Sequence, residues 1–229
     1  PDGEQIAWLS DASGEYQLHV GDRLGREEPK AFDLGGDGFY YSPSWSPDGA
    51  HVLFNDKGNR IAFVTLETGE VTMVASVQGS LGTVQPTAVW SPDSTWIAFE
   101  DRNPRTLYDT IALYELETGA TTTVTDAFAF ASNPAFSSDG GHLYFVASTN
   151  RGSSLMGLNM STSASRDWDG SLYVAVLTAD GENPLAPRND EAVDEQDAED
   201  DGEEPAAEDA AEEGDDSDDA DDADGGDEV

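Results

Sequence analysis

A turn motif recurs four times along this chain of 229 residues. Its aspartates are 46, 45 and 46 residues apart, at Asp2, Asp48, Asp93 and Asp139. The four copies read Pro1-Asp2-Gly3, Trp45-Ser46-Pro47-Asp48-Gly49, Trp90-Ser91-Pro92-Asp93-Ser94 and Phe136-Ser137-Ser138-Asp139-Gly140. Each copy is followed by a short apolar stretch. A fixed period of this length is typical of solenoids, propellers and arrays, in which one supersecondary unit is repeated.

Each repeat unit is predicted to consist of β-strands joined by turns. Pro, Asp and Gly favour tight turns, and the short β-branched and aromatic runs between them favour strands. A second turn signal, Glu-Thr-Gly, follows at residues 67–69 and 117–119. We find no helical periodicity before residue 190. For the second unit the predicted strands are about Pro43–Ser46, His51–Asn55, Arg60–Leu66 and Glu70–Ala75.

Four-stranded units with a period of 40–50 residues predict an all-β fold, a partial β-propeller of about three and a half blades. The predicted blades lie near residues 1–34, 39–77, 85–127 and 132–187. A closed propeller usually has 4–8 blades. We therefore expect a piece of a propeller that is cut inside a blade. A β-sandwich is the structural alternative, although a sandwich does not require a regular period.

The charge of the chain divides it into two parts. It carries 48 acidic and 10 basic residues, a net charge of −38, and 23 of the acids lie in residues 190–229 without any Lys or Arg. All Trp, Tyr and Phe residues lie at or before Tyr173. A segment without aromatic residues and with dense like charge cannot form a core. We expect a folded part at 1–189 and an acidic disordered tail or insertion at 190–229.

Composition also excludes classes of partner. Binding to nucleic acid requires clustered Lys and Arg, and an anionic membrane surface would repel this chain, so we expect neither partner. The absence of cysteine excludes disulfides but fits either cytoplasm or periplasm.

No residue pattern indicates catalysis, a metal or a cofactor, so the sequence predicts no catalytic, metal-binding or cofactor-binding residue. His51 and His142 each follow a repeat aspartate by three residues, and His19 lies on a predicted strand, which favours structural roles. The chain contains no G-x-S-x-G nucleophile motif, H-E-x-x-H motif or glycine-rich phosphate loop. The repeat aspartates are interpreted as turn residues.

Binding is expected at the end of the sheets that carries the long loops. In an antiparallel blade, the repeat turns share one end, and the connections between the second and third strands and between blades share the other. Four arginines lie on these long connections and are the candidate contacts for a peptide backbone or carboxylate: Arg102, Arg105, Arg151 and Arg166. Simple surface solvation is the alternative interpretation of these arginines.

Over residues 1–189 the repeats resemble the propellers of TolB and of the tricorn protease. Three longer stretches resemble bacterial tricorn homologues: Gly35 to Trp45, Ile111 to Asp126, and Asn133 to Gly152, with the closing Pro184-Leu185-Ala186-Pro187. In that family two propellers precede a PDZ domain and a serine-protease core. The resemblance places this chain in the second, seven-bladed propeller. No position matches the catalytic residues of the family.

The resemblance implies a non-catalytic segment that guides or gates peptide substrates toward a catalytic core elsewhere in a serine peptidase. Its partners would be peptides and the remaining domains of the same polypeptide, with a homo-oligomer formed through the parent protein. A cytoplasmic location follows from the same resemblance, with the periplasm as the alternative. Two other functions stay open: a TolB-type protein-binding platform, and the propeller of a prolyl-oligopeptidase-like enzyme.

Overall fold

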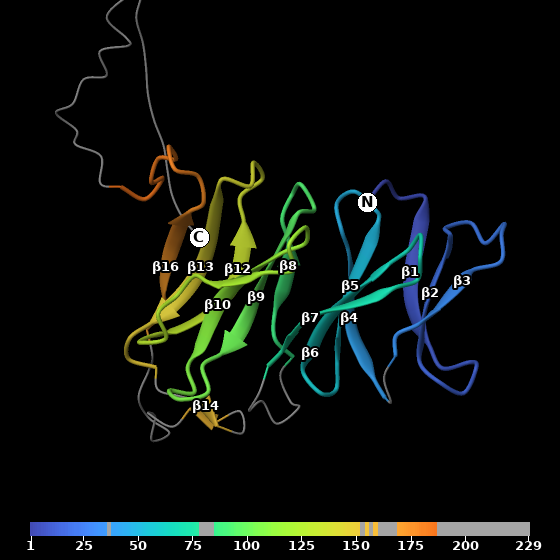
Figure 1. Cartoon of the computed structure of the whole chain (residues 1–229), viewed down its shortest axis with the longest axis horizontal. Coiled ribbons are helices and arrows are strands. Elements are labelled where there is room, and N and C mark those ends of the chain that lie inside the picture. The colour runs from blue at the N-terminus through green and yellow to red at the C-terminus, as the bar shows by residue number, and fades with distance from the viewer. Residues whose placement is uncertain (36–37, 78–84, 152–153, 156–157, 160–168, 187–229) are drawn as a thin grey trace, which may run out of the picture. The chain divides into compact units, whose positions relative to one another are not determined.

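The computed structural model describes residues 1–35, 38–77, 85–151, 154–155, 158–159 and 169–186. Pro1–Ala186 form one compact unit, and Pro187–Val229 are assigned to a second that lies outside the described residues. The described residues contain strands and turns but no helix, so none of their segments is a helix able to cross a bilayer. The predicted all-β class is confirmed (Figure 1). The predicted disorder of residues 190–229 falls outside the description and stays a prediction.

The first two sheets are antiparallel and follow chain order. The first holds three strands, β1 (Gln5–Ser10), β2 (Gln17–Asp22) and β3 (Lys30–Asp33). The second holds four strands, β4 (Tyr40–Trp45), β5 (His51–Asp56), β6 (Arg60–Thr65) and β7 (Val71–Ser76). Each strand pairs with its neighbour in sequence, which is the up-and-down order expected of a propeller blade.

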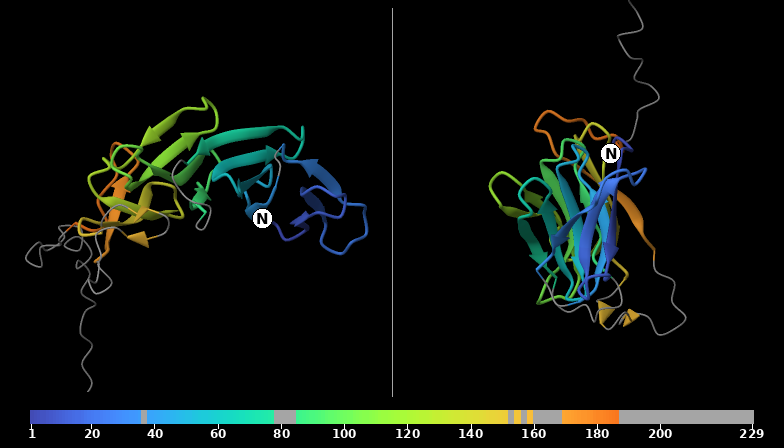
Figure 2. Two further views of the ribbon diagram at one scale, coloured as in Figure 1. Left: turned by 90° about the horizontal axis from the view of Figure 1, so that it is seen from below. Right: turned by 90° about the vertical axis from the view of Figure 1, so that its right-hand side faces the viewer.

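The third and fourth sheets repeat the arrangement. The third holds β8 (Ala88–Trp90), β9 (Trp96–Arg102), β10 (Asp109–Glu115) and β11 (Thr121–Thr123). The fourth holds β12 (Phe130–Phe136), β13 (His142–Ser148) and β16 (Ser171–Val176). A separate hairpin, β14 (Ser154–Leu155) with β15 (Leu158–Asn159), interrupts the connection from β13 to β16. Within Pro1–Ala186 the four sheets stand one after another (Figure 2).

Three apolar clusters lie between successive sheets. The cluster between the first and second sheets contains Leu18, Phe32 and Val64, and that between the second and third contains Phe63, Trp90 and Ile97. The third cluster joins Ala98 and Ile111 to the fourth sheet. The middle strands are therefore buried on both faces. In β6, for example, the consecutive residues Phe63 and Val64 are both buried. This explains why such strands have continuous apolar sequences rather than alternating ones.

The repeat motif forms the same turn in three copies. In the second unit, the Ser46 hydroxyl bonds to Asp48 and accepts the backbone N–H of His51 at 2.9 Å. Ser91 and Ser137 make the matching bonds in the third and fourth units. The residue after the aspartate has a positive φ, which glycine tolerates without strain. The exception is Ser94, a non-glycine residue at φ 63°.

The structure departs most from the predicted strand limits at the first strand of the second unit. In the second unit this strand begins at Tyr40 rather than at Pro43. The ladder shifts register between Tyr41 and Ser44, where Ser42 has φ 52°. Because a bulge leaves a residue outside the ladder, Pro43 costs no strand hydrogen bond there. The fourth sheet has the same shift, with Asn133 at φ 56° before Pro134. The described part of the fourth sheet holds three strands, whereas the sequence predicts four for each unit.

Candidate functional site

The connections between the strands lie at two opposite ends of the sheets. The repeat turns before β5, β9 and β13 lie at one end, the upper end in Figure 1. The connections β5–β6 and β9–β10, the link from β3 to β4 and the β14–β15 hairpin belong to the opposite end. The antiparallel order of the strands places them there. This second end, called here the loop end, carries the predicted arginines that the structure describes.

Arg102 is held inside the third sheet. Its Nε lies 2.7 Å from Oδ1 of Asp109, which faces it across the β9–β10 pair, and its side chain is only 9% exposed. A guanidinium in this position joins two strands, and an ion pair of this kind orders both side chains. Arg105, in the connection between the same strands, is exposed, and its backbone N–H bonds to Asn103.

Arg151 is half-buried at the end of the fourth sheet. Its guanidinium lies over the ring of Phe130, 3.6 Å from the centroid, which is a cation–π arrangement. Burial lowers the pKa of Arg151, and the negative charges of Asp109 and Glu100 oppose this effect. The structure thus brings Arg151 into the same charged group as the Arg102–Asp109 pair. Arg166 lies outside the described residues.

Glu100 links the first strands of two sheets at the loop end. Its carboxylate accepts the backbone N–H of Thr87 at 3.0 Å and that of Asn133 at 2.7 Å. Burial raises the pKa of Glu100 above its ordinary value, while these two hydrogen bonds act in the opposite direction. Asn55 holds the corresponding position on β5 and donates from Nδ2 to the carbonyl of Pro86 at 2.8 Å. Both side chains connect one sheet to the next.

The histidines and the repeat aspartates have structural contacts. His51 lies 3.2 Å from the hydroxyl of Thr65 and stacks against Trp90, and His142 Nε2 lies 2.8 Å from the carbonyl of Glu182. The Ser91 hydroxyl lowers the pKa of Asp93 within its turn. These side chains belong to the core and the turns. Among the described residues there is no group of three or more His, Asp or Glu arranged to hold a metal ion.

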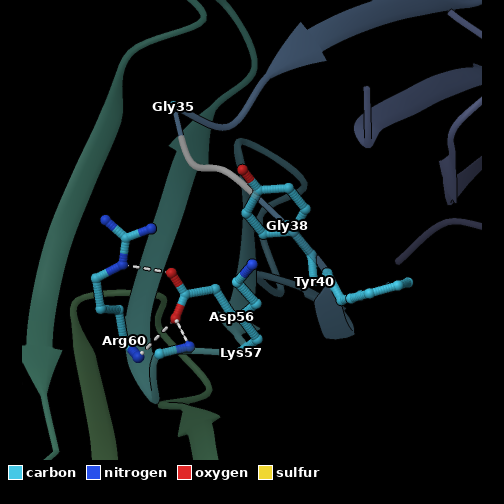
Figure 3. A pocket seen from close by; sticks show the side chains of 8 residues that line it. Gly35, Gly38, Tyr40, Asp56, Lys57 and Arg60 are labelled. Atoms are coloured by element: carbon cyan, nitrogen blue, oxygen red, sulfur yellow. Dashed lines mark hydrogen bonds and ion pairs between the residues drawn. The ribbon is translucent and has the colours of Figure 1, made fainter. Parts of the chain in front are cut away.

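A polar pocket of about 350 Å³ opens at the loop end of the second sheet. The described residues that form it come from two places, next to the start of β4 and around the β5–β6 turn. Its lining residues are Gly35, Gly38, Phe39, Tyr40, Asp56, Lys57, Gly58 and Arg60. Figure 3 shows Tyr40, Asp56, Lys57 and Arg60 around this hollow. It contains two of the ten basic residues of the chain and one acid among its lining.

Asp56, the acidic residue of the pocket, already has hydrogen-bond and ion-pair partners within the protein. Asp56 is 5% exposed and accepts the backbone N–H groups of Gly58 and Arg60 at 2.8 and 2.9 Å. It also pairs with Nε of Arg60. Lys57 lies against Gly38, where a Cβ would come within 2.6 Å of its Cε and Nζ. The backbone N–H of Lys57 donates to the carbonyl of Phe39 at 3.0 Å, which ties the two segments together.

Sequence reasoning missed Lys57 and Arg60. It considered arginines on long connections, whereas Arg60 begins a strand and Lys57 lies in a three-residue turn. Their shared position depends on the pairing of β4 with β5, which brings the β3–β4 link beside the β5–β6 turn. The one available signal was that Lys57 and Lys30 are the only lysines of the chain.

Comparison with protein-family models and with curated proteins gives no match. Solved structures do match. The tricorn protease superposes with a TM-score of 0.61 at 19% sequence identity, over 81% of this chain and 18% of that one. An oligogalacturonate lyase from Vibrio parahaemolyticus has a TM-score of 0.50 at 17% identity, over 63% of this chain and 43% of that one. TolB from Acinetobacter baumannii has a TM-score of 0.48 at 22% identity, over 78% and 41%.

These matches concern the fold, because every identity lies below 25%. The chain spans about a fifth of the tricorn protease and less than half of the lyase. At the level of fold, the tricorn-like resemblance of the repeats is confirmed. The chain is similar to part of a β-propeller.

Proposed function

We propose that this chain is a non-catalytic β-propeller segment that guides peptide substrates toward the catalytic core of a tricorn-like serine peptidase. The observation that carries the proposal is the superposition of four-fifths of the chain on the tricorn protease. That protein is a protease, and a propeller segment of a protease needs to handle peptides rather than cleave them. The remaining domains of the same polypeptide are the other proposed partners.

The loop end supports a binding role. It combines the link from β3 to β4 and the β9–β10 connection with the charged group around Glu100 and the pocket around Lys57. Binding and catalytic groups concentrate on loops that a rigid scaffold positions. The repeat turns at the opposite end are short, and their polar side chains bond within the turns. A peptide is therefore proposed to bind at the loop end.

Fluorescence anisotropy with labelled peptides of eight to ten residues tests the binding role, and mass spectrometry of the same samples tests for cleavage. We expect reversible binding and intact peptides. Cleavage by the purified chain, abolished by a serine-directed fluorophosphonate, would contradict a non-catalytic role. Absence of any peptide binding would contradict the guiding role and favour a platform for folded proteins.

The reading frame of the gene supplies an independent test. A PDZ domain followed by a serine-protease core downstream supports the proposal. A G-x-S-x-G motif downstream would support a prolyl-oligopeptidase-like enzyme instead. The cytoplasm is the compartment that belongs to this proposal, and recovery of the native protein in a periplasmic fraction would overturn that part of it.

A further inference from the structure

We propose that the pocket formed by Gly38, Lys57 and Arg60 binds a carboxylate, and that its ligand is the C-terminal carboxylate of a peptide. The choice of a peptide as the ligand rests on the proposed function. The preference for a carboxylate rests on the pocket itself. Its charge, its geometry and its apolar wall each contribute to the argument.

The first argument is charge. Residues 1–189 carry 25 acids and 10 bases, a net charge of −15, so a pocket with a positive balance stands out against its surroundings. Lys57 and Arg60 contribute two positive charges, and Asp56 neutralises one of them. One positive charge remains for a ligand. A single carboxylate balances this charge, whereas a phosphate dianion would leave a negative charge in an already acidic protein.

The second argument is that Arg60 is held in place before any ligand arrives. Asp56 accepts both the backbone N–H and the side-chain Nε of Arg60. Figure 3 shows the two terminal nitrogens of Arg60 directed away from the Asp56 carboxylate. The Arg60 side chain is 39% exposed, so these nitrogens are accessible. A guanidinium presents its donors in a planar fork that matches the two oxygens of a carboxylate.

The third argument is the position of the Lys57 side chain against Gly38. Gly38 has φ 149°, and its missing side chain leaves the space in which the end of Lys57 lies. Any larger residue at position 38 would displace the Lys57 ammonium group. Glycine therefore places a flexible lysine on the pocket wall, which lowers the entropic cost of ordering it around a ligand.

The fourth argument is the apolar wall. Phe39 is 53% exposed and contacts the ring of Tyr16, with 5.0 Å between centroids. Tyr40 lines the same pocket and is 6% exposed. Ligand pockets commonly combine apolar walls with a few polar groups that fix orientation. The terminal residue of the preferred peptide is accordingly expected to be apolar or aromatic.

The test is anisotropy of fluorescein-labelled Ala-Ala-Phe as the free acid and as the C-terminal amide. We expect the amide to bind about tenfold more weakly, because it lacks the charge that Lys57 and Arg60 recognise. An internal-acid peptide, Ala-Asp-Phe-amide, separates a terminal carboxylate from a side-chain carboxylate. Equal binding of the free acid and the amide, or tighter binding of the internal-acid peptide, would overturn the proposal.

Variants locate the binding. K57M and G38V are each expected to weaken binding of the free acid about tenfold and to leave the amide unchanged. R60K keeps the positive charge beside Asp56 but lacks the planar pair of guanidinium donors. We therefore expect its affinity for the free acid to lie between those of wild type and K57M. R23Q is the matched control, since Arg23 is an exposed arginine between β2 and β3 and does not line the pocket. Circular dichroism checks that each variant is folded. Normal binding by K57M and G38V, or a loss in R23Q alone, would overturn the assignment.

Asp37 follows the pocket residue Gly35 closely in sequence and lies outside the described residues. D37N removes a negative charge, so binding of the free acid is expected to stay the same or to tighten, and weaker binding would contradict the proposal. The outcomes also separate carboxylate binding in the pocket from the proposed guiding of peptides. If peptides bind K57M and G38V as tightly as wild type, the pocket is not the binding site, but the proposed guiding role is still supported. If no peptide binds, both fail.

Discussion

The carboxylate of Glu100 accepts the backbone N–H of Asn133 at 2.7 Å, across 33 residues of sequence and from one sheet to the next. The same carboxylate accepts the N–H of Thr87 at 3.0 Å. Asn133 lies at the register shift of β12, where a backbone donor has no partner within the ladder. Glu100 thus satisfies donors on two first strands, and it does so at the cost of burying its charge.

The pH dependence of stability reports this burial. Because the pKa of Glu100 is raised in the folded protein above its ordinary value of 4.5, the folded state binds the proton more tightly than the unfolded state. The contribution of this group to stability is therefore largest below pH 4.5 and is lost as the pH rises through the folded pKa. We expect the stability of wild type relative to E100Q to increase as the pH falls from 7 toward 4.5. Urea unfolding at several pH values measures it.

The control for this experiment is E67Q, at an exposed turn position. Other carboxylates titrate over the same range in wild type and variant alike, so their effects cancel in the difference. A difference between wild type and E100Q that stays constant with pH, or one that shrinks as the pH falls, would contradict the role of burial at Glu100.

Ser94 is predicted to be a strained position of the third repeat turn. The other copies have Gly3, Gly49 and Gly140 there, with φ between 73° and 78°. Ser94 has φ 63°, but its hydroxyl accepts the backbone N–H of Asp48 at 3.0 Å in the neighbouring unit. S94A retains the strain and loses the bond, whereas S94G loses the bond and relieves the strain. We expect S94A to be less stable than S94G by about 1 kcal/mol.

Chemical denaturation of both Ser94 variants measures this difference. G49A is the matched control, because a Cβ at Gly49 would meet Pro1 only at an ordinary contact distance of 3.7 Å. Its destabilisation, also about 1 kcal/mol, then reports backbone strain alone. If S94A is as stable as S94G, strain at φ 63° is not the energetic feature that distinguishes the third turn.

Asn55 is predicted to stabilise the junction between the second and third sheets. Its side chain is buried, and its Nδ2 donates to the carbonyl of Pro86. N55A leaves that carbonyl without its donor in a buried position, which costs about 1–3 kcal/mol. The matched control is V146A, since Val146 holds the corresponding place on β13 without a polar side chain. Thermal or urea unfolding compares the two. A loss for N55A no larger than for V146A would contradict the prediction.

The fourth sheet is predicted to promote self-association. Tyr173 and Ala175 pair with Phe145 and Leu143, which pack toward the third sheet. Leu172 and Val176 therefore project from the other face, where they are 58% and 37% exposed. Exposed apolar patches drive association. We expect wild type to associate as salt is added, because salt screens charge repulsion beyond about 8–10 Å near physiological ionic strength.

Light scattering across a salt series measures this association. The double variant L172E/V176E is expected to remain monomeric where wild type associates. L24E adds a charge at another exposed leucine, which is 62% exposed in the connection between β2 and β3, and should behave as wild type. A wild type that stays monomeric at every salt concentration would show that this face is not adhesive.

The sequence alone determined the class of fold and its period. Turn motifs such as Ser46-Pro47-Asp48-Gly49 act through bonds between residues two to five positions apart, so their chemistry is readable from neighbouring letters. The strands that follow them are apolar on both faces because each sheet lies between others, and this too is visible as a run of apolar residues. The four sheets, their order and the confirmed propeller architecture follow from those two local signals.

Only the tertiary structure decided which polar residues meet. The sequence predicts that Arg102 and Arg151 both lie on long connections, yet Arg102 ends β9 and is paired with Asp109, and Arg151 lies over Phe130. Register across β9 and β10 determines the first contact, and sheet-to-sheet placement determines the charged group around Glu100. Lys57 and Gly38 are neighbours because the bulged pairing of β4 with β5 brings two loops together. Such contacts depend on register and packing between distant segments, which a local pattern of residues does not encode.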